Sequence, residues 1–380
     1  MLRKDLDVYV FIAILNAAVF FLFSSPQLKL DYKAFYSAGR AAMASPARAY
    51  DPDQQFSSAG LWNSRDTALT YYHPPHELLL LGPLSLLPYR TSLAVWRMLS
   101  VVCFVLATLL LARTYELPFK RVFSFSAAIF GVTFCLLEGQ DSLLMLLLLS
   151  ASLYFAQRRS DLAAGCLLGV SLFKPQIPII IAVAMLVSGR RRFALSFACT
   201  AAVIGTASFA VIGGQGLRQM LDLLRTAEMR EVPSQMISLR GLFSFFPNGQ
   251  LLSVIASAGL IASFVLVWRK LENVAALYGS AILVGALSAF HFHGQDLSML
   301  VIPMLLLARK SQHGFTTEAA MWSLLLSPLF LFLLYWGVPG LLALSVLVLT
   351  LRVWRDVYAE GNTFRSAMPP VPSANLSING

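Results

Sequence analysis

A few polar segments in an otherwise apolar chain carry the residues that can do chemistry. The first is Asp31-Tyr32, about eight residues beyond an N-terminal apolar run. A carboxylate in a partly dry cleft can act as a general base and take a proton from an acceptor hydroxyl group. A solvated loop acid or a helix cap would look the same in sequence, and position alone favours that simpler interpretation.

Two further segments combine acids or an imidazole with turn-forming residues. Tyr71–Pro75, which includes Tyr72 and His73, lies where the chain returns to apolar sequence. Aromatic residues at such a place usually form an interfacial belt, which position favours. Glu138–Asp141, which includes Gln140, puts two acids on a short turn. It is either a plain polar turn, slightly favoured, or a group that binds a hydroxylated ligand or a cation through carboxylate oxygens.

A lysine occupies an unusual place between two apolar runs, in the turn Lys174-Pro175-Gln176. A lysine recessed among apolar helices is costly and usually has an anionic partner. A phosphate group would suit it, and snorkelling of the side chain to the membrane surface is the alternative. The two interpretations are evenly balanced.

Two histidines, His291 and His293, precede Asp296 and a short apolar run. Their spacing is not a zinc signature, so hydrogen-bonding or charge-orienting roles are favoured. In the polar stretch 213–249, an amphipathic helix on the membrane surface accounts for most of the arginines. Arg240, beside Ser238, is better placed to bind a phosphate.

The composition indicates which kind of element must position these residues. Of the 380 residues, 57% are hydrophobic and only 13% are charged, and the mean hydropathy is +0.69. A soluble domain would carry about 25% charge, so we expect an all-α polytopic integral membrane protein. The net charge of +10 fits basic cytoplasmic loops. The chain lacks the soluble basic face with aromatics that a nucleic-acid partner would need.

About twelve apolar runs have the character of membrane helices. They lie at 8–23, 92–112, 122–137, 142–156, 162–173, 176–188, 193–212, 250–267, 273–290, 297–308, 317–335 and 338–351. With twelve crossings, the short basic clusters all fall on one side, which the positive-inside rule makes cytoplasmic. Both termini are then cytoplasmic. The first run is expected to be a retained signal anchor rather than a cleaved signal peptide.

This topology predicts one transmembrane domain, 1–355, with two long outer loops, 24–91 and 213–249, and a disordered cytoplasmic tail, 356–380. The short run 78–87 is expected to be re-entrant or interfacial. Runs 162–173 and 176–188 give only about 20 Å of helix each, against about 30 Å of hydrocarbon. The turn at Lys174 should therefore lie below the outer surface, in an outward-facing cavity.

The four cysteines, Cys103, Cys135, Cys166 and Cys199, all fall inside apolar runs. We expect them to be buried thiols that behave as small hydrophobes, with no disulfide and no metal site.

Several motifs, in a fixed order, carry a resemblance to a known family. They are Asp31 to Arg40, Ala49-Tyr50-Asp51-Pro52, Tyr72-His73-Pro74-Pro75, Gly82-Pro83-Leu84, Leu87-Pro88, Gly139 to Leu143, Gly165 and Gly169, Lys174-Pro175-Gln176, Arg190 to Arg192, Ser238 to Leu242, and Gln295-Asp296-Leu297 with Pro303. Over about residues 8–310 the chain resembles the GT-C fold glycosyltransferases, and within them glycosyltransferase family 87, also described as a DUF2029 family.

The resemblance implies an inverting transfer of a sugar, usually mannose, from a polyprenyl-phosphate-linked donor to a glycolipid or cell-envelope glycan acceptor. It implies a site on the periplasmic or outer face of a bacterial inner membrane. Asp31 would be the base, and Lys174 and Arg240 would bind the donor phosphate. The remaining candidates for substrate binding are Tyr32, Tyr72, His73, Gln140, Asp141, Gln176, Ser238, His291, His293 and Asp296. Many GT-C enzymes need a metal, so Mg²⁺ or Mn²⁺ is a possible cofactor, but no metal ligands are assigned.

The chain departs from the family pattern in having His73 where an aromatic or apolar residue often precedes the diproline. Two other classes compete with a glycosyltransferase. A flippase or transporter of polyprenyl-linked glycolipids would have charged residues at the membrane midplane and often inverted repeats. A polysaccharide polymerase or ligase would have one dominant late outer loop rich in arginine, whereas here the first loop dominates.

Overall fold

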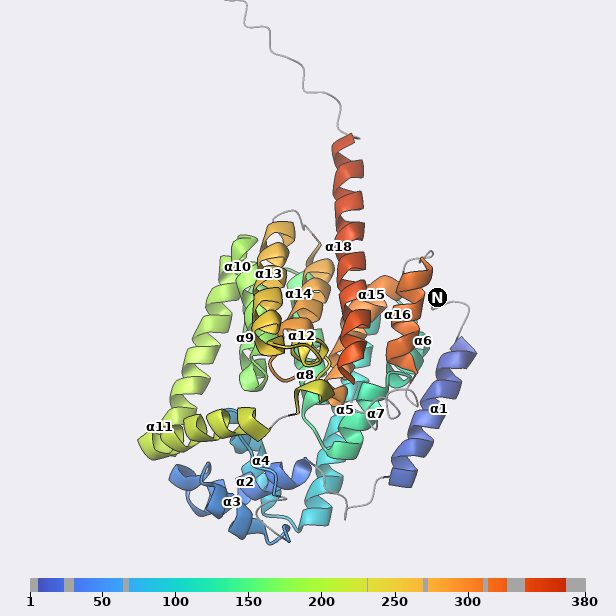
Figure 1. Ribbon diagram of the computed structural model, residues 1–380. Coiled ribbons are helices and arrows are strands. Elements are labelled where there is room, and N and C mark those ends of the chain that lie inside the picture. Colours follow the sequence, from blue (N-terminus) through green and yellow to red (C-terminus); the bar gives the residue numbers. More distant parts are fainter. Residues whose placement is uncertain are drawn as a thin grey trace, which may run out of the picture.

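The computed structural model describes residues 6–23, 31–63, 68–230, 232–268, 273–309, 314–326 and 339–366, and Figure 1 shows their arrangement. All the regular elements in these ranges are α-helices or short 3-10 helices, labelled η. The prediction of an all-α chain is therefore confirmed for the described residues.

The first half of the chain forms a long helix, a group of short helices and then a bundle. Its elements are α1 (Leu6–Phe23), α2 (Tyr32–Ala44), η1 (Pro46–Arg48), α3 (Pro52–Ala59), η3 (Pro75–Glu77), α4 (Leu78–Ser85), α5 (Tyr89–Tyr115), α6 (Phe119–Ala127), α7 (Phe130–Glu138), α8 (Ser142–Gln157), α9 (Asp161–Val170), η4 (Ser171–Phe173) and α10 (Gln176–Val187).

The second half continues the bundle. Its elements are α11 (Arg191–Arg230), η5 (Pro233–Gln235), α12 (Leu239–Phe243), α13 (Gly249–Trp268), α14 (Val274–Ser288), η6 (Gly294–Leu300), α15 (Val301–Ala308), α16 (Phe315–Leu325), η7 (Pro339–Leu341) and α18 (Leu342–Ser366).

Four described helices are long and apolar enough to cross a membrane: α1, α5, α11 and α13. The bent pair α6 and α7 makes a fifth if it counts as one span, and five shorter apolar segments of 10–17 residues accompany them. Large apolar side chains such as Phe11, Phe21 and Val203 are exposed on these helices, as contact with lipid requires. The chain is therefore membrane-embedded, while twelve crossings and the GT-C fold stay predictions.

The predicted run 122–137 is not one helix. It divides into α6 and α7, which meet at 64°, because Ile129 adopts an extended conformation. The break leaves backbone carbonyls without helical partners, and the Asn16 side chain of α1 donates to two of them, Ala127 O at 3.3 Å and Ala128 O at 3.1 Å. A side chain from a neighbouring helix therefore satisfies the backbone that the break frees.

Helix α11 bends at Gly213, whose φ of 64° and ψ of −175° are open to glycine alone. Its second part runs across one end of the bundle, beside the group α2–α4 (Figure 1). The predicted outer loop 213–249 is thus helical up to Arg230. At the opposite end of the bundle α18 projects outward and continues to Ser366. The predicted disordered tail, 356–380, is therefore helical at its start, and 367–380 lies outside the described residues.

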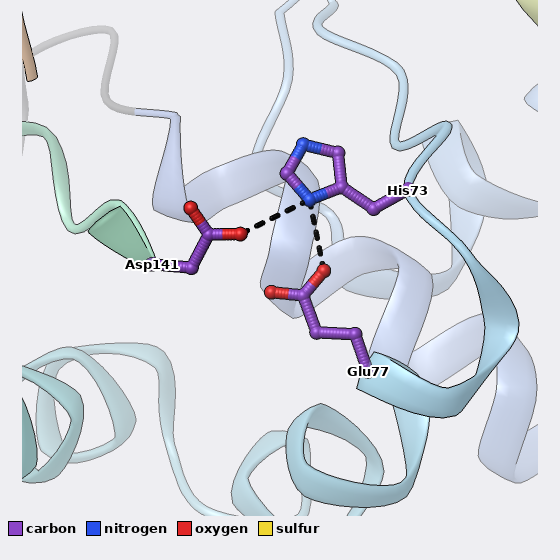
Figure 2. A group of neighbouring side chains, drawn as sticks. All are labelled: His73, Glu77 and Asp141. Atoms are coloured by element: carbon purple, nitrogen blue, oxygen red, sulfur yellow. Dashed lines mark hydrogen bonds and ion pairs between the residues drawn. The ribbon is translucent and has the colours of Figure 1, made fainter. Parts of the chain in front are cut away.

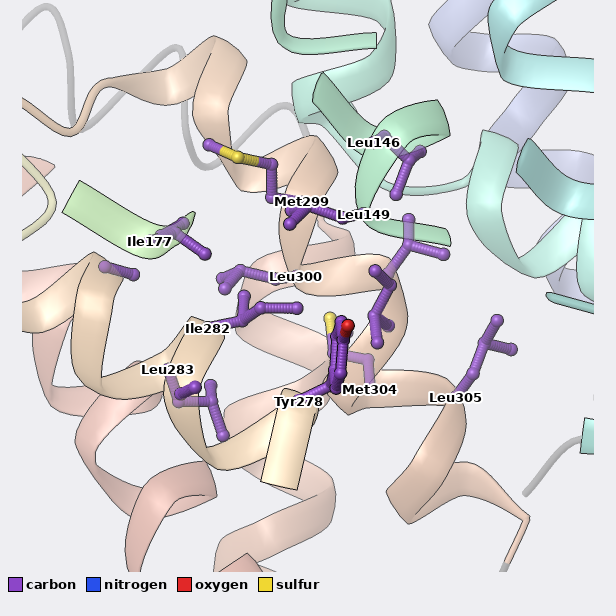
Figure 3. Packing of buried hydrophobic residues seen from close by; sticks show 14 of the residues in the cluster. Leu146, Leu149, Ile177, Tyr278, Ile282, Leu283, Met299, Leu300, Met304 and Leu305 are labelled. Carbon is purple, nitrogen blue, oxygen red and sulfur yellow. The ribbon is translucent and has the colours of Figure 1, made fainter. Parts of the chain in front are cut away.

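Two apolar clusters form the interior. The larger one joins α5 to α10 with α14, η6, α15 and α18, and Figure 3 shows part of it around Tyr278, with Leu149, Ile282 and Leu300 nearby. The smaller one joins α2 to α4 with α5 and α11, and its largest members are Tyr32, Tyr50, Tyr71 and Trp96. Of the residues singled out above, Tyr32 belongs to the smaller cluster and Tyr72 packs against it.

The cysteines agree only in part with expectation. All four are free thiols, and Cys103 and Cys135 are buried. The prediction of burial is wrong for Cys166 and Cys199, which are exposed. Cys166 lies on α9 and Cys199 on α11, and the Cys166 thiol lies 3.0 Å from Ser196 Oγ of α11.

Candidate active site

The turn between α7 and α8 is held in place by two residues of α5. The Trp96 indole N–H donates to Gly139 O at 2.9 Å. The Arg97 guanidinium donates to Leu136 O at 2.9 Å and Leu137 O at 2.8 Å. The last carbonyls of a helix have no partners within the helix, so these three bonds fix the end of α7. Gly139 ends the helix with a φ of 68°, which favours glycine.

This turn positions Asp31 at the start of α2. The Asp31 backbone N–H donates to Glu138 Oε2 at 3.3 Å, and the Gln140 side-chain amide donates to Asp31 Oδ2 at 2.6 Å. The close approach depends on Gly139, because a Cβ there would lie 2.7 Å from the Cβ of Tyr32. The turn therefore brings an amide donor to the predicted base.

Tyr32 itself serves as support for this contact. Its ring stacks on Trp96 with centroids 5.8 Å apart, and its hydroxyl lies 2.7 Å from Ser92 Oγ. The side chain is fully buried, so it anchors α2 against α5 rather than facing a substrate in this arrangement. Its predicted contact with substrate stays a prediction.

Five side chains of alternating charge form a continuous line beside Asp31, which we name the charge chain: Glu77, His73, Asp141, Lys174 and Asp296. His73 Nδ1 lies 2.9 Å from Glu77 Oε2 and 3.2 Å from Asp141 Oδ2, as Figure 2 shows. Lys174 Nζ lies 2.8 Å from Asp141 Oδ1 and 2.5 Å from Asp296 Oδ1. The charge chain therefore joins the segment that carries His73 and Glu77 to the turns before α8, α10 and α15.

The inner end of the charge chain is fully engaged. Lys174 Nζ also donates to Ser142 Oγ at 2.7 Å. The ammonium group thus donates to Ser142 and Asp296 and forms an ion pair with Asp141. Asp296 Oδ2 accepts the His293 backbone N–H at 3.0 Å, which caps η6. Lys174 therefore orients two carboxylates in this arrangement, and its predicted contact with a donor phosphate stays a prediction.

Burial and nearby charges both act on the Asp31 carboxyl. Burial raises the pKa of the Asp31 carboxyl above its ordinary value, against the hydrogen bond from Gln140. Positive charge on His293, Lys174 and His73 also opposes the rise. A general base works best when its pKa lies near the working pH, so a raised carboxyl pKa suits this role.

Within the charge chain, His73 and Glu77 are both perturbed. Burial would lower the pKa of His73, but the carboxylates of Glu77 and Asp141 outweigh it and raise that pKa to about 10. Burial also raises the pKa of Glu77. These groups thus hold one another in place by charge.

Tyrosines tie the segment before α4 to the charge chain. Tyr50 donates to His73 O at 2.5 Å, and Tyr71 donates to Glu77 Oε2 at 3.0 Å. Gln55 accepts the Tyr71 N–H at 2.9 Å and donates to Tyr71 O at 3.2 Å. The described residues of the segment predicted as a polar loop therefore form a wall that presents His73.

A model of glycosyltransferase family 87 matches residues 71–303, well over half of the chain. The chain belongs to glycosyltransferase family 87. No curated protein matches the chain. The matched range includes the whole charge chain, and it begins after Asp31.

The other residues predicted for this glycosyltransferase lie around the rim. The ring of His291 is 6.1 Å from that of Tyr72 and 5.0 Å from that of Phe290. Arg240 lies over the Phe290 ring at 3.6 Å from its centroid. These four residues form an aromatic edge beside the charge chain, with Arg240 at its outer end.

Two predicted residues sit deeper. Ser238 is fully buried just before α12, and its hydroxyl has no hydrogen-bond partner among the described residues. Gln176 is the partly buried first residue of α10, two positions after Lys174. Of the two histidines, His293 is among the groups whose charge acts most strongly on Asp31.

The sequence reasoning missed two members of the site. Glu77 bonds both Tyr71 and His73, and Ser142 bonds both Lys174 and Asp296. Glu77 follows His73 by four residues, a spacing that lets side chains meet in a helical turn and that could have revealed it. Ser142 looked like an ordinary start of a helix.

Proposed function

We propose that this family 87 glycosyltransferase moves a mannosyl group from a polyprenyl-phosphate-linked donor to a glycolipid or cell-envelope glycan, with inversion. The site would face the periplasm or exterior of a bacterial inner membrane. The observation that carries the proposal is the partly buried Asp31 carboxylate, bound by Gln140 next to the charge chain. Asp31 would take the acceptor proton as the acceptor oxygen attacks the anomeric carbon.

The apolar surroundings of the site support a lipid-linked donor. A cavity of about 120 Å³ lies between Pro74 to His76, the residues that directly follow His73, and the helices α9 and α11. Its lining includes Gly169, Ile204 and Phe209 and is mostly apolar. A lipid chain can enter such a groove from the bilayer while the phosphate and sugar reach the polar residues.

The leaving phosphate needs positive charge in its neighbourhood, since preorganised charge is usually the largest contribution to such catalysis. Positive charge on His73, His293 and Lys174 acts on Asp31, which supports a role for these residues near the departing phosphate. Arg240, at the outer edge, is the cation best able to reach a phosphate without breaking a buried ion pair.

The test uses full-length protein in lipid nanodiscs, a membrane lipid extract as acceptor, and either polyprenyl-phosphate mannose or a nucleotide-linked mannose as donor. We expect transfer from the polyprenyl donor alone, and a loss of about 10²–10⁴-fold in Asp31→Asn, the usual contribution of a general base. Asp222→Asn, at an exposed residue on α11, is the matched control and should keep full activity.

Full transfer by Asp31→Asn would refute the assignment of the base. Transfer from the nucleotide-linked donor would refute the donor class. Movement of labelled glycolipid across the bilayer without any transfer would support the competing flippase.

A further inference from the structure

His73, Glu77 and Asp141 have the geometry of a cation site. One ring nitrogen and one oxygen from each carboxylate lie within 4.8 Å of one another, and Figure 2 shows both carboxylates facing the same nitrogen of His73. The nitrogen lies 2.9 Å from one oxygen and 3.2 Å from the other. Ligands in adjacent positions about 2.1 Å from a six-coordinate ion are about 3 Å apart, so these separations suit ligands of one ion.

Hydrogen bonding alone satisfies this group poorly. A ring nitrogen carries one hydrogen at most, so Nδ1 cannot donate well to two carboxylates. Glu77 Oε1 is buried and has no hydrogen-bond partner among the described residues. Two buried carboxylates that face one nitrogen require positive charge between them.

The charges of the wider cluster point the same way. Glu77, Asp141 and Asp296 carry three formal negative charges, and Lys174, which contacts Asp141 and Asp296, carries one positive charge. A divalent ion bound to a neutral His73 would balance these formal charges. Buried charge is costly unless it is compensated.

We propose that His73 Nδ1, Glu77 and Asp141 bind one divalent cation, with Mn²⁺ favoured over Mg²⁺ because one ligand is an imidazole. Lys174 binds Asp141 Oδ1 and leaves Oδ2 for the ion. Three protein ligands leave coordination positions open to water or to a phosphate oxygen.

The role of the ion, though not its binding, rests on the proposed function. As the acceptor oxygen bonds to the anomeric carbon, the bond from that carbon to the phosphate oxygen breaks and its electron pair stays on the phosphate. The acceptor proton passes to Asp31. A cation at His73 compensates the charge that grows on the departing phosphate.

The experiment measures Mn²⁺ binding to purified, EDTA-treated full-length protein in detergent, with Mn²⁺ alone as the probe. We expect one ion per chain, counted by elemental analysis, and a ¹⁴N coupling from His73 in the pulsed EPR spectrum of the bound ion. Glu77→Gln and His73→Asn should each weaken binding at least about tenfold, and His73→Asn should remove the nitrogen coupling. Asp222→Asn is the matched control and should bind as the wild type does.

The outcomes separate this inference from the proposed function. Absence of stoichiometric binding to the wild type, or binding by Glu77→Gln equal to wild type, overturns the cation site even where sugar transfer is observed. Stoichiometric binding with the nitrogen coupling supports the site even where polyprenyl-phosphate mannose proves not to be the donor. Two single substitutions are used so that a folding failure of one still leaves the other as a test.

Discussion

Substitution of Lys174 by methionine should destabilise the protein strongly, because it removes the cation between Asp141 and Asp296. The two ion pairs, at 2.8 and 2.5 Å, each correspond to about 6 kcal/mol of attraction at an effective dielectric constant of 20. Removing the ammonium group also removes the cost of several kcal/mol for taking it out of water, which offsets part of this loss. The expected loss is therefore about 3–5 kcal/mol in the free energy of unfolding, the range found when one partner of a buried ion pair is removed.

The same geometry predicts a rescue. Oxygens of Asp141 and Asp296 that share one Nζ lie no more than about 5 Å apart, so without Lys174 they repel by about 3 kcal/mol. Adding Asp296→Asn to Lys174→Met should recover about that amount. The free energy of unfolding would be measured by SDS titration in mixed micelles containing EDTA.

Lys120→Met is the matched control, since Lys120 is exposed on α6 and should change the free energy of unfolding by less than about 0.5 kcal/mol. A loss of less than about 1 kcal/mol in Lys174→Met, or no recovery in the double variant, would refute the reasoning that these carboxylates are buried and charged together.

Three further predictions concern the base, its supporting turn and the topology. Burial raises the pKa of Asp31, so the folded chain holds that proton more tightly than the unfolded chain does. The free energy of unfolding therefore falls as the pH rises from the ordinary pKa of an aspartate to the raised one. Asp31→Asn should lose transfer yet melt at a higher temperature at neutral pH. The wild-type transfer rate should fall on acidification through the raised pKa. Gly139→Ala should cost about 1–2 kcal/mol for its positive φ and more for the contact with Tyr32, and a melting temperature equal to wild type would contradict this. Single cysteines at Gly60 and Arg192, both exposed, should react with impermeant reagents from opposite sides of the membrane if there are twelve crossings.

The apolar runs predicted the bounds of several helices closely, because the length of an apolar run can be counted directly from the sequence. The runs 142–156, 176–188 and 250–267 correspond to α8, α10 and α13 with bounds that differ by one residue or less at each end. The break at Ile129 could not be predicted from the local sequence, because the side chain that binds the freed carbonyls is that of Asn16, more than a hundred residues earlier. The turn at Gly213 was read as the end of a helix, although glycine here bends the chain and the helix resumes.

For the site, the sequence predicted most of the polar residues and their common location. It did not predict how they pair. Lys174 is predicted to bind a donor phosphate, but Asp141 and Asp296 already compensate the charge of its ammonium group. Which charged side chains pair depends on which turns meet at the end of the bundle. That meeting is set by the packing of α5, α8, α10 and η6, which cannot be read from the sequence alone. The residues most easily missed, Glu77 and Ser142, are those whose roles exist only after the turns have met.

The contact from Asn16 to the break between α6 and α7 has a consequence for biogenesis. An asparagine in the middle of an apolar helix lacks partners in hydrocarbon, and so do the carbonyls of Ala127 and Ala128. Each side satisfies the other only when both are in the bilayer. Helix α1 therefore gains these two hydrogen bonds only after a segment made more than a hundred residues later has entered the bilayer.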